Sequence, residues 1–185
     1  MTNLVPRTKF ILPRICCLCS YRTLKQPYGI LGIWPVLEEL MSLVFREAAA
    51  EDVPYLMAIR TSVTENVLSD PDSITPELCA EYLTVIGKGW VCEIDGQVAG
   101  FSIAALKDTS IWALFIHPDF EGRGIGTRLL DLAVGWLFET GASRIFLSTG
   151  IDTRADQFYT LRGWSRGEFL PNGEVRFTLE RPPAT

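Results

Sequence analysis

The apolar residues of positions 41–185 fall into short segments whose spacing alternates between strand-like and helical, with turn residues between the segments. Runs rich in β-branched and aromatic side chains predict strands. Asp95-Gly96 separates two such runs and is a strong hairpin signal. We expect strands at residues 43–46, 90–94, 97–105, 111–116, 144–148, 164–170 and 175–179.

The remaining patterned segments have helical spacing and recognisable end signals. Acidic residues and Pro54 occupy the first turn of one segment, where they suit the helix dipole and the free N–H groups. Thr75 is a typical capping residue, and Gly141 and Gly163 are typical helix stops. We expect helices at residues 50–62, from Thr75 to about Ile86, and at 127–140 and 155–161.

The order of these elements predicts the fold class. An antiparallel run of strands followed by a strand–helix–strand crossover gives an α/β (α+β) protein. We expect a mixed, mostly antiparallel central sheet of six to seven strands, with about four helices on its faces. Residues 41–185 suffice for a single domain with a proper core. We expect residues 1–40 to be an N-terminal extension that has no fixed fold or is not part of the native chain, because the patterned region starts at Met41.

Composition and charge argue against two classes of binding partner, nucleic acid and membrane. Apolar residues make up 48% of the chain and charged residues 21%, which is typical of a soluble globular protein. Residues 1–40 hold five of the 17 basic and two of the 22 acidic residues, so the rest holds 12 basic and 20 acidic residues. Such an acidic domain is poorly suited to nucleic acid. No apolar run approaches the roughly 18–20 residues that span a membrane. We therefore expect neither partner.

The cysteines predict neither disulfides nor a metal site. Three of the five, Cys16, Cys17 and Cys19, cluster outside the patterned region, and the total is odd. The single histidine, His117, lies far from them, so no tetrahedral set of metal ligands is complete. We expect Cys79 and Cys92 to pack as small buried residues in a reducing, cytoplasmic compartment.

Residues 121–126 are the most informative stretch of the chain. They read Glu-Gly-Arg-Gly-Ile-Gly and lie between an apolar strand and a long helix. A helix N-terminus presents backbone N–H groups without partners and a positive dipole end. Glycines let the main chain approach a ligand closely, so the stretch predicts a phosphate or pyrophosphate site.

Two other classes of phosphate-binding loop have known sequence motifs with which these glycines can be compared. A P-loop requires a lysine after its glycines, and none follows Lys107. A dinucleotide fingerprint requires a third glycine, where the chain has Thr127 or Leu129, depending on the starting glycine. A tight turn without any ligand stays open as an alternative.

Two motifs together resemble the GNAT superfamily of acyl-CoA N-acyltransferases, over about residues 43–179. The family's pyrophosphate loop reads Gln/Arg-x-x-Gly-x-Gly/Ala, which residues 121–126 resemble. Its second signature reads Asn-x-x-Ala-x-x-Phe-Tyr and is followed by Gly-Phe. Residues 152–159 read Asp-Thr-Arg-Ala-Asp-Gln-Phe-Tyr, and Gly163 and Trp164 follow. The chain departs from the family at Glu121, beside an expected anion, and at Asp152, which lacks the amide donor of asparagine.

The resemblance implies acetyl-CoA as co-substrate and no metal. The backbone of Phe115 and Ile116 would meet the pantetheine amides, and residues 123–128 would surround the pyrophosphate. The cofactor-binding residues that the resemblance implies are Phe115, Ile116, His117, Arg123, Gly124, Ile125, Gly126, Thr127, Arg128, Asp152 and Phe158.

The resemblance also implies Tyr159 as the general acid that protonates the leaving thiolate; the alternative is an aromatic that only packs the last helix on the sheet. The general base is not identified, because many family members place a glutamate where this chain has Ser110 and its neighbours. The candidates for the base are Asp108, Glu93, Glu168, His117 and an ordered water.

We therefore expect an enzyme that transfers an acetyl group from acetyl-CoA to a primary amine of a small-molecule acceptor, by direct attack on the thioester. A protein lysine or N-terminal acetyltransferase, and an inactive CoA-binding sensor, stay open. The first two helices and the terminal hairpin would build the acceptor pocket, which Trp112 and Trp164 would line unless they are core residues. A homodimer is possible.

Overall fold

The computed structural model describes residues 42–64 and 73–183, and all of these belong to one compact unit, residues 38–185. The predictions for residues 1–40, including the three clustered cysteines, lie outside the described residues and stay predictions. No helix in the described ranges is long and apolar enough to cross a membrane.

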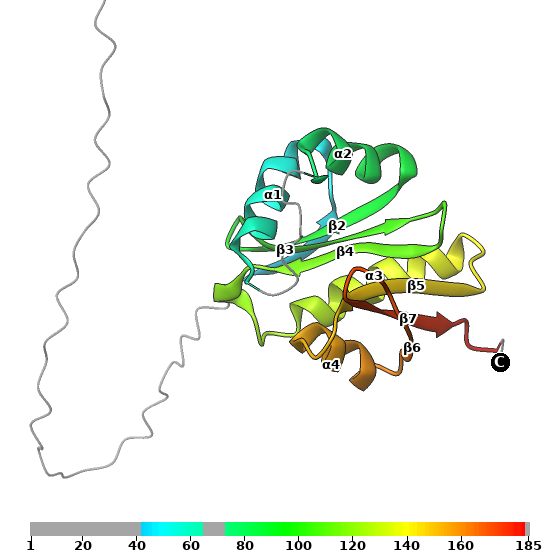
Figure 1. Ribbon diagram of the computed structural model, residues 1–185. Coiled ribbons are helices and arrows are strands. Elements are labelled where there is room, and N and C mark those ends of the chain that lie inside the picture. Colours follow the sequence, from blue (N-terminus) through cyan, green and yellow to red (C-terminus); the bar gives the residue numbers. More distant parts are fainter. Residues whose placement is uncertain (1–41, 65–72, 184–185) are drawn as a thin grey trace, which may run out of the picture. The chain divides into compact units, whose positions relative to one another are not determined.

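The described residues form one seven-stranded sheet with helices on its two faces, which confirms the predicted fold class (Figure 1). The sheet order is β1-β2-β3-β4-β5-β7-β6, and β4 and β5 are the parallel pair. The strands are β1 Leu43–Glu47, β2 Gly87–Ile94, β3 Gln97–Ala105, β4 Ser110–Ile116, β5 Arg144–Gly150, β6 Ser165–Phe169 and β7 Glu174–Glu180. The helices are α1 Val53–Ser62, α2 Pro76–Glu81, α3 Ile125–Glu139 and α4 Arg154–Leu161, with short helical turns η1 Ala50–Asp52, η3 Tyr82–Ile86 and η4 Pro118–Phe120.

Two of the predicted helices contain more than one kind of helical turn. The first begins with the 3₁₀ turn η1, and its α-helical part starts at Val53. The second begins at the Thr75 cap, whose side chain accepts the N–H of Leu78 at 3.2 Å, and ends in the π-helical turn η3. The spacing of apolar residues gave no sign of these changes, because turns of three and five residues are too short for that spacing to distinguish one helix type from another.

The sheet separates two cores, which explains the near-continuous apolar character of β2 and β3. Trp90 and Cys92 face the core that α3 covers, whereas Val91, between them, faces the core that α1 and α2 cover. Period-two alternation places successive side chains on opposite faces, and both faces are buried here. The expected burial of Cys79 and Cys92 is confirmed.

Strands β4 and β5 separate soon after they meet. Their only pairing is Ser110 with Phe146. Just beyond it, the register between β3 and β4 skips Trp112, so this residue is the extra one of a β-bulge. The remainder of β4 continues along β3, while β5 continues along β7. A wedge therefore opens in the middle of the sheet, between two strands that are parallel neighbours.

Candidate active site

The glycine-rich loop connects the end of β4 to the start of α3. Gly122 and Gly124 have φ angles of 73° and 77°, in the left-handed region where a side chain would be strained. Gly124 is the N-cap of α3, and its carbonyl accepts the N–H of Arg128 at 3.2 Å. The N–H groups of residues 125–127 lie in the first turn of this 15-residue helix. A helix leaves the N–H groups of its first turn without partners inside the helix. The loop therefore presents N–H groups and a positive dipole end.

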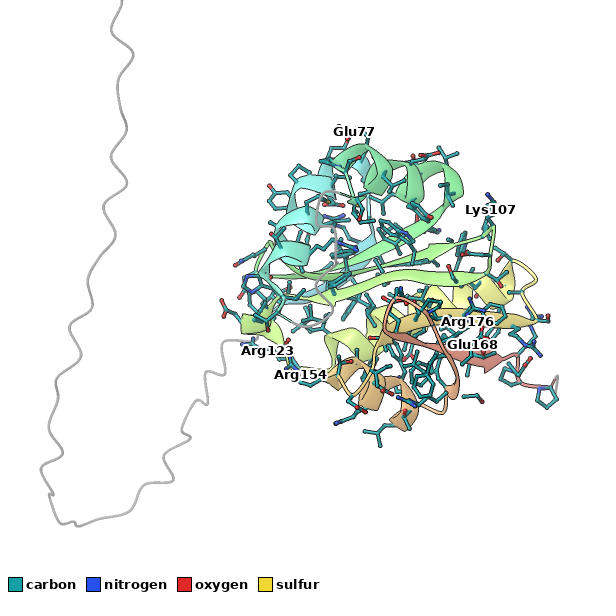
Figure 2. All side chains as sticks on the ribbon, in the orientation of Figure 1. Glu77, Lys107, Arg123, Arg154, Glu168 and Arg176 are labelled. Carbon is teal, nitrogen blue, oxygen red and sulfur yellow. The ribbon has the colours of Figure 1, made fainter. Side chains whose placement is uncertain are left out.

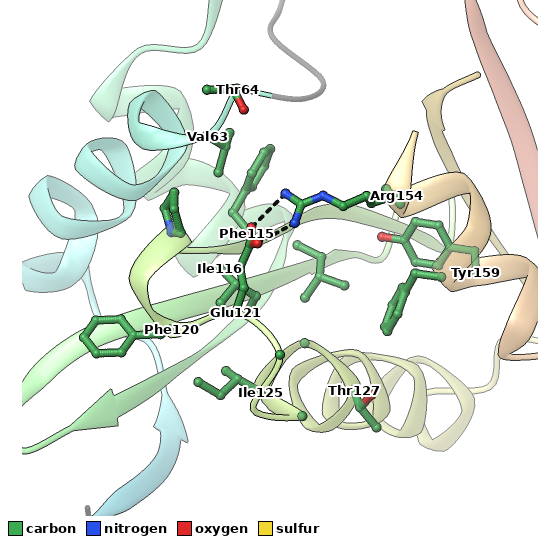
Figure 3. A pocket seen from close by; sticks show the side chains of 17 residues that line it. Val63, Thr64, Phe115, Ile116, Phe120, Glu121, Ile125, Thr127, Arg154 and Tyr159 are labelled. Carbon is green, nitrogen blue, oxygen red and sulfur yellow. Dashed lines mark hydrogen bonds and ion pairs between the residues drawn. The ribbon is translucent and has the colours of Figure 1, made fainter. Parts of the chain in front are cut away.

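A pocket of about 530 Å³ extends from this loop along the end of β4 to the first turns of α4; we call it the first pocket (Figure 3). Seven of the predicted cofactor-binding residues line it, together with Tyr159. Those seven are Phe115, Ile116, Gly124, Ile125, Gly126, Thr127 and Phe158. The loop and the aromatic pair of α4, which are far apart in the sequence, thus meet at one cavity.

Four predicted residues do not line the first pocket. His117 caps η4, and its Nδ1 accepts the N–H of Asp119 at 3.3 Å. Arg123 packs over the Phe120 ring, 5.4 Å from its centroid. Arg128 and Asp152 lie on the elements next to the pocket without contributing to its wall. Their binding roles stay predictions, and any such role would require side-chain movement or backbone groups.

An ion pair lies at the edge of the first pocket. The Arg154 guanidinium donates to both carboxylate oxygens of Glu121, at 2.5 and 3.0 Å (Figure 3). Both residues line the pocket, although the sequence analysis did not assign Arg154 a role. The carboxylate that departs from the family motif therefore lies at the proposed anion site, but a cation offsets its charge.

A second pocket, of about 380 Å³, lies next to the first. It extends from the end of α1 to the loop between β6 and β7, and it shares Leu114, Phe115, Ala155 and Tyr159 with the first pocket. Its other lining residues are Arg60, Ile74, Asp108, Ser110, Ile111, Trp112, Ala113, Phe146, Leu147, Ser148, Thr149, Leu170, Glu174 and Arg176. Two cavities thus share a common wall where the sheet opens.

Comparison with known proteins agrees with this geometry. The family model of the acetyltransferase (GNAT) family matches residues 39–164. The chain belongs to this family.

Individual relatives are more distant. An uncharacterized N-acetyltransferase from Methanocaldococcus jannaschii is 32% identical over 91 residues, which cover 44% of this chain and 40% of that protein. The chain thus spans about two fifths of the length of this curated relative.

Two solved structures share the fold. PaiA N-acetyltransferase from Thermoplasma acidophilum, in complex with coenzyme A, has a TM-score of 0.66 at 16% identity, over 76% of this chain and all of that one. The ribosomal-protein-S18-alanine N-acetyltransferase from Escherichia coli has a TM-score of 0.64 at 16% identity, over 78% of this chain and 97% of that one.

Tyr159 lines both pockets of this GNAT domain. It is 6% exposed and packs against the rings of Phe158, Trp164 and Phe177. Within the described ranges, its hydroxyl has no hydrogen-bond partner. Every fully buried side-chain oxygen in those ranges does have a partner, so the Tyr159 hydroxyl is not fully buried. The hydroxyl therefore reaches open space, and Figure 3 shows it pointing into the first pocket. Burial raises the pKa of Tyr159 above its usual value, so the phenol keeps its proton at neutral pH.

The structure separates the candidates for the general base. Glu93 lies outside both pockets and accepts from Arg46 at 2.9 Å. Glu168 is also outside the pocket walls and pairs with Arg176 at 2.9 Å on the β6–β7 hairpin (Figure 2). Asp108 does line the second pocket, where it accepts the Ser110 hydroxyl at 2.8 Å.

The sequence analysis missed three charged residues of the second pocket, and one of them, Arg176, pairs with Glu168; the other two are Glu174 and Arg60. Glu174 accepts the Ser148 hydroxyl at 2.5 Å, and Arg60 lies at the α1 end. Neither belongs to a recognisable motif, and only the pairing of β7 with β5 and the packing of α1 on the sheet bring them together. Trp112 lines this pocket, whereas Trp164 is a core residue, 5% exposed.

A buried carboxylate holds the start of α4 in place. Asp156 is 6% exposed and accepts from the Arg166 guanidinium at 3.0 and 2.9 Å and from the Asp152 N–H at 3.0 Å. The hydrogen bonds from Arg166 lower the pKa of Asp156 below its usual value. Asp152 has a φ of 59°, so its N–H needs a defined acceptor to hold this turn. Asp156 therefore helps to position the helix that carries Tyr159.

Proposed function

We propose that this protein transfers an acetyl group from acetyl-CoA to a primary amine of a small-molecule acceptor, by direct attack of the amine on the thioester. The observation that carries the proposal is the wall common to both pockets. Leu114, Phe115, Ala155 and Tyr159 line both the cavity that ends at the glycine loop and the cavity that ends at α1 and the hairpin. Two substrates bound in these cavities would meet at Tyr159.

The residues of the first pocket fit acetyl-CoA. Left-handed Gly122 and Gly124 turn the main chain so that the first N–H groups of α3 can bind a pyrophosphate. The separated edge of β4 can pair with the amide groups of an extended ligand, as an added strand would. Acetyl-CoA supplies the thioester as an activated acetyl donor. The related GNAT structure from Thermoplasma acidophilum holds coenzyme A, which supports the same class of ligand here.

The reaction has two proton transfers, and residues of the pockets can perform both. An alkylamine with a pKa near 10.4 is neutral in roughly one molecule in 2,500 at pH 7, so a base must take its proton. Asp108 and Glu174 are the described carboxylates in the second pocket, and either can act directly or through a water. As the new C–N bond forms and the C–S bond breaks, Tyr159 donates its proton to the thiolate. A positioned acid or base contributes about 10²–10⁴ in rate.

The size of the second pocket favours a small acceptor. A volume of about 380 Å³ falls in the range of small-molecule sites. The related enzyme from Escherichia coli acts on a ribosomal protein, so protein N-termini and lysines belong in any acceptor screen. Two features favour an enzyme over an inactive CoA-binding sensor. They are the Tyr159 hydroxyl at the common wall and the two carboxylates in the second pocket. A homodimer and a cytoplasmic location stay predictions.

Calorimetric titration of acetyl-CoA into the full chain tests the proposal first. We expect micromolar binding that is lost in a Gly124→Glu and Gly126→Glu double variant, because the added carboxylates would occupy the anion site. The matched control is Gly135→Glu in the middle of α3, where no atom lies within 4 Å of an added Cβ. A panel of amines and peptides with thiol detection follows. The absence of acetyl-CoA binding by the unmodified chain would refute the proposal.

A further inference from the structure

Arg60 near the end of α1 lies at the second pocket and has no other evident role. Its guanidinium carbon lies 5.7 Å from the centroid of the Trp112 ring and 4.9 Å from that of Phe115. Arg60 lines the second pocket and is absent from the wall of the first. It is therefore placed to contact the acceptor rather than the cofactor, one side chain away from the wall that the two pockets share.

Among the charged residues that line this pocket, Arg60 differs from the others in its contacts within the described residues. Arg176 pairs with Glu168, Asp108 accepts from Ser110, and Glu174 accepts from Ser148. Within residues 42–64 and 73–183, Arg60 has no carboxylate or hydrogen-bond acceptor.

Burial makes this charge costly. It lowers the pKa of the Arg60 guanidinium from its usual value, while arginine still keeps its charge at neutral pH. A half-buried cation without a counter-ion costs folding free energy, and a bound anion would remove that cost.

We propose that the acceptor is a primary amine that also carries a carboxylate, of the amino-acid class, and that Arg60 binds this carboxylate. The inference rests on the proposed acetyl transfer, because it assigns the second pocket to the acceptor. The planar fork of a guanidinium matches the two oxygens of a carboxylate. A single guanidinium without a counter-ion among the described residues matches a carboxylate better than a phosphate dianion, which would also face Asp108 and Glu174. The same two carboxylates suit the ammonium end of an amino acid.

Matched pairs of acceptors test the assignment in the full chain. Each common L-amino acid is compared with its own carboxamide, by thiol release with acetyl-CoA and, separately, by ligand-observed NMR binding without acetyl-CoA. We expect at least one pair in which the carboxylate member is strongly preferred. Because the carboxamide has the more acidic ammonium group, its amine is more often neutral, so this preference would run against intrinsic reactivity.

Three variants show whether Arg60 causes the preference. Arg60→Met keeps the apolar stem on Trp112 and should lower kcat/KM for the carboxylate member about 10- to 100-fold, the range for losing a hydrogen bond to a charged group. Its kcat/KM for the carboxamide should not change. For Arg60→Lys, kcat/KM for the carboxylate member should lie between the values of the unmodified chain and of Arg60→Met. Lysine keeps the positive charge but lacks the planar fork of the guanidinium. The control Arg144→Met removes an exposed arginine that pairs with Glu180 outside both pockets, and should keep the preference.

The two measurements separate this inference from the proposed function. If the carboxylate members bind preferentially and depend on Arg60, but no amine is acetylated, the carboxylate site stands and the acetyl transfer fails. If amines are acetylated without preference for the carboxylate, or if Arg60→Met keeps the preference, the assignment of Arg60 is wrong. Equal binding of both members without any transfer overturns both.

Discussion

The two pockets are built by different means, although they share a wall. The first pocket depends on backbone geometry, because left-handed glycines, a helix N-terminus and a separated strand edge provide its polar groups. The second depends on side chains, and its charged residues come from α1, the turn before β4 and strand β7. The first therefore suits a ligand that is constant across a family, and the second suits a ligand that can differ between members.

The same difference explains what each pocket can tolerate. Backbone N–H groups survive most substitutions, so the proposed anion site does not depend on the residue type at position 121. Side chains such as Arg60 and Glu174 can change one at a time and alter the charge of the second pocket. Specificity for the acceptor should therefore follow the second pocket alone, whereas catalysis should depend on the residue that touches both.

The largest effect should come from Tyr159→Phe, because this side chain lines both pockets. Loss of the hydroxyl should lower kcat by about 10²–10⁴. Phenylalanine keeps the packing on Trp164 and Phe177, so acetyl-CoA affinity should stay within a few-fold in calorimetry. An unchanged kcat would assign Tyr159 to packing alone.

The pKa of Tyr159 adds a stability test of the same variant. Burial holds this pKa above its unfolded value of about 10, so the folded state resists losing the proton. The unfolded state binds fewer protons above that pH, and stability should therefore decline as the pH rises beyond about 10. Chemical denaturation at pH 8 and above pH 10 should show a smaller decline for Tyr159→Phe. Equal declines would contradict the assigned burial of the phenol.

Asp156→Asn should affect stability and thereby both pockets, since Asp156 supports the helix that forms part of each. We expect a loss of about 1–3 kcal/mol in the free energy of unfolding at pH 7, because Arg166 and the Asp152 N–H lose a charged acceptor. The pKa of Asp156 is lowered, so its contribution is present above the unfolded value of about 3.9 and lost as the pH falls below it. Urea unfolding should thus show the two proteins converging in acid. A difference that persists at low pH would point to packing instead of charge.

Trp112→Leu should affect only the second pocket. Trp112 stacks on Tyr82, with ring centroids 4.1 Å apart, and lies under the Arg60 guanidinium. Loss of the cation–π contact should raise the KM for the acceptor about 2- to 30-fold. The Kd of acetyl-CoA should change by less than about two-fold, since Trp112 does not line the first pocket. Equal changes in both constants would mean that the pockets are energetically coupled.

The sequence predicted the parts of the molecule whose physical causes are local. Glycines, caps and apolar periodicity are local, and they led to the element order and the loop before α3, whereas the family resemblance implied that the loop and Tyr159 belong to one site. The changes of helix type at η1 and η3 were not predicted; η3 packs against β2 and β3, which are contacts that the local sequence does not show.

The second pocket could not be predicted in the same way. Arg60 and Glu174 lie more than a hundred positions apart and become neighbours of one cavity only through the sheet order. The bulge at Trp112 depends on the register of β3 against β4, which the alternation of the two strands did not reveal. The resemblance implied His117 and Arg128 as cofactor-binding residues; neither lines the first pocket, and their binding roles stay predictions.

The smallest effect should come from Glu121→Gln, which changes only the first pocket. This substitution removes a negative charge beside the N-terminus of α3, where an anion is favoured by about 0.3–1 kcal/mol. The Kd of acetyl-CoA should therefore fall about 2- to 5-fold in calorimetry at low salt, and the gain should shrink as salt screens the charge. The control Glu139→Gln lies at the opposite end of α3 and should leave the Kd unchanged. Weaker binding by Glu121→Gln would instead show that Glu121 holds Arg154 in a position that acetyl-CoA requires, so that this edge of the first pocket, too, would depend on side chains.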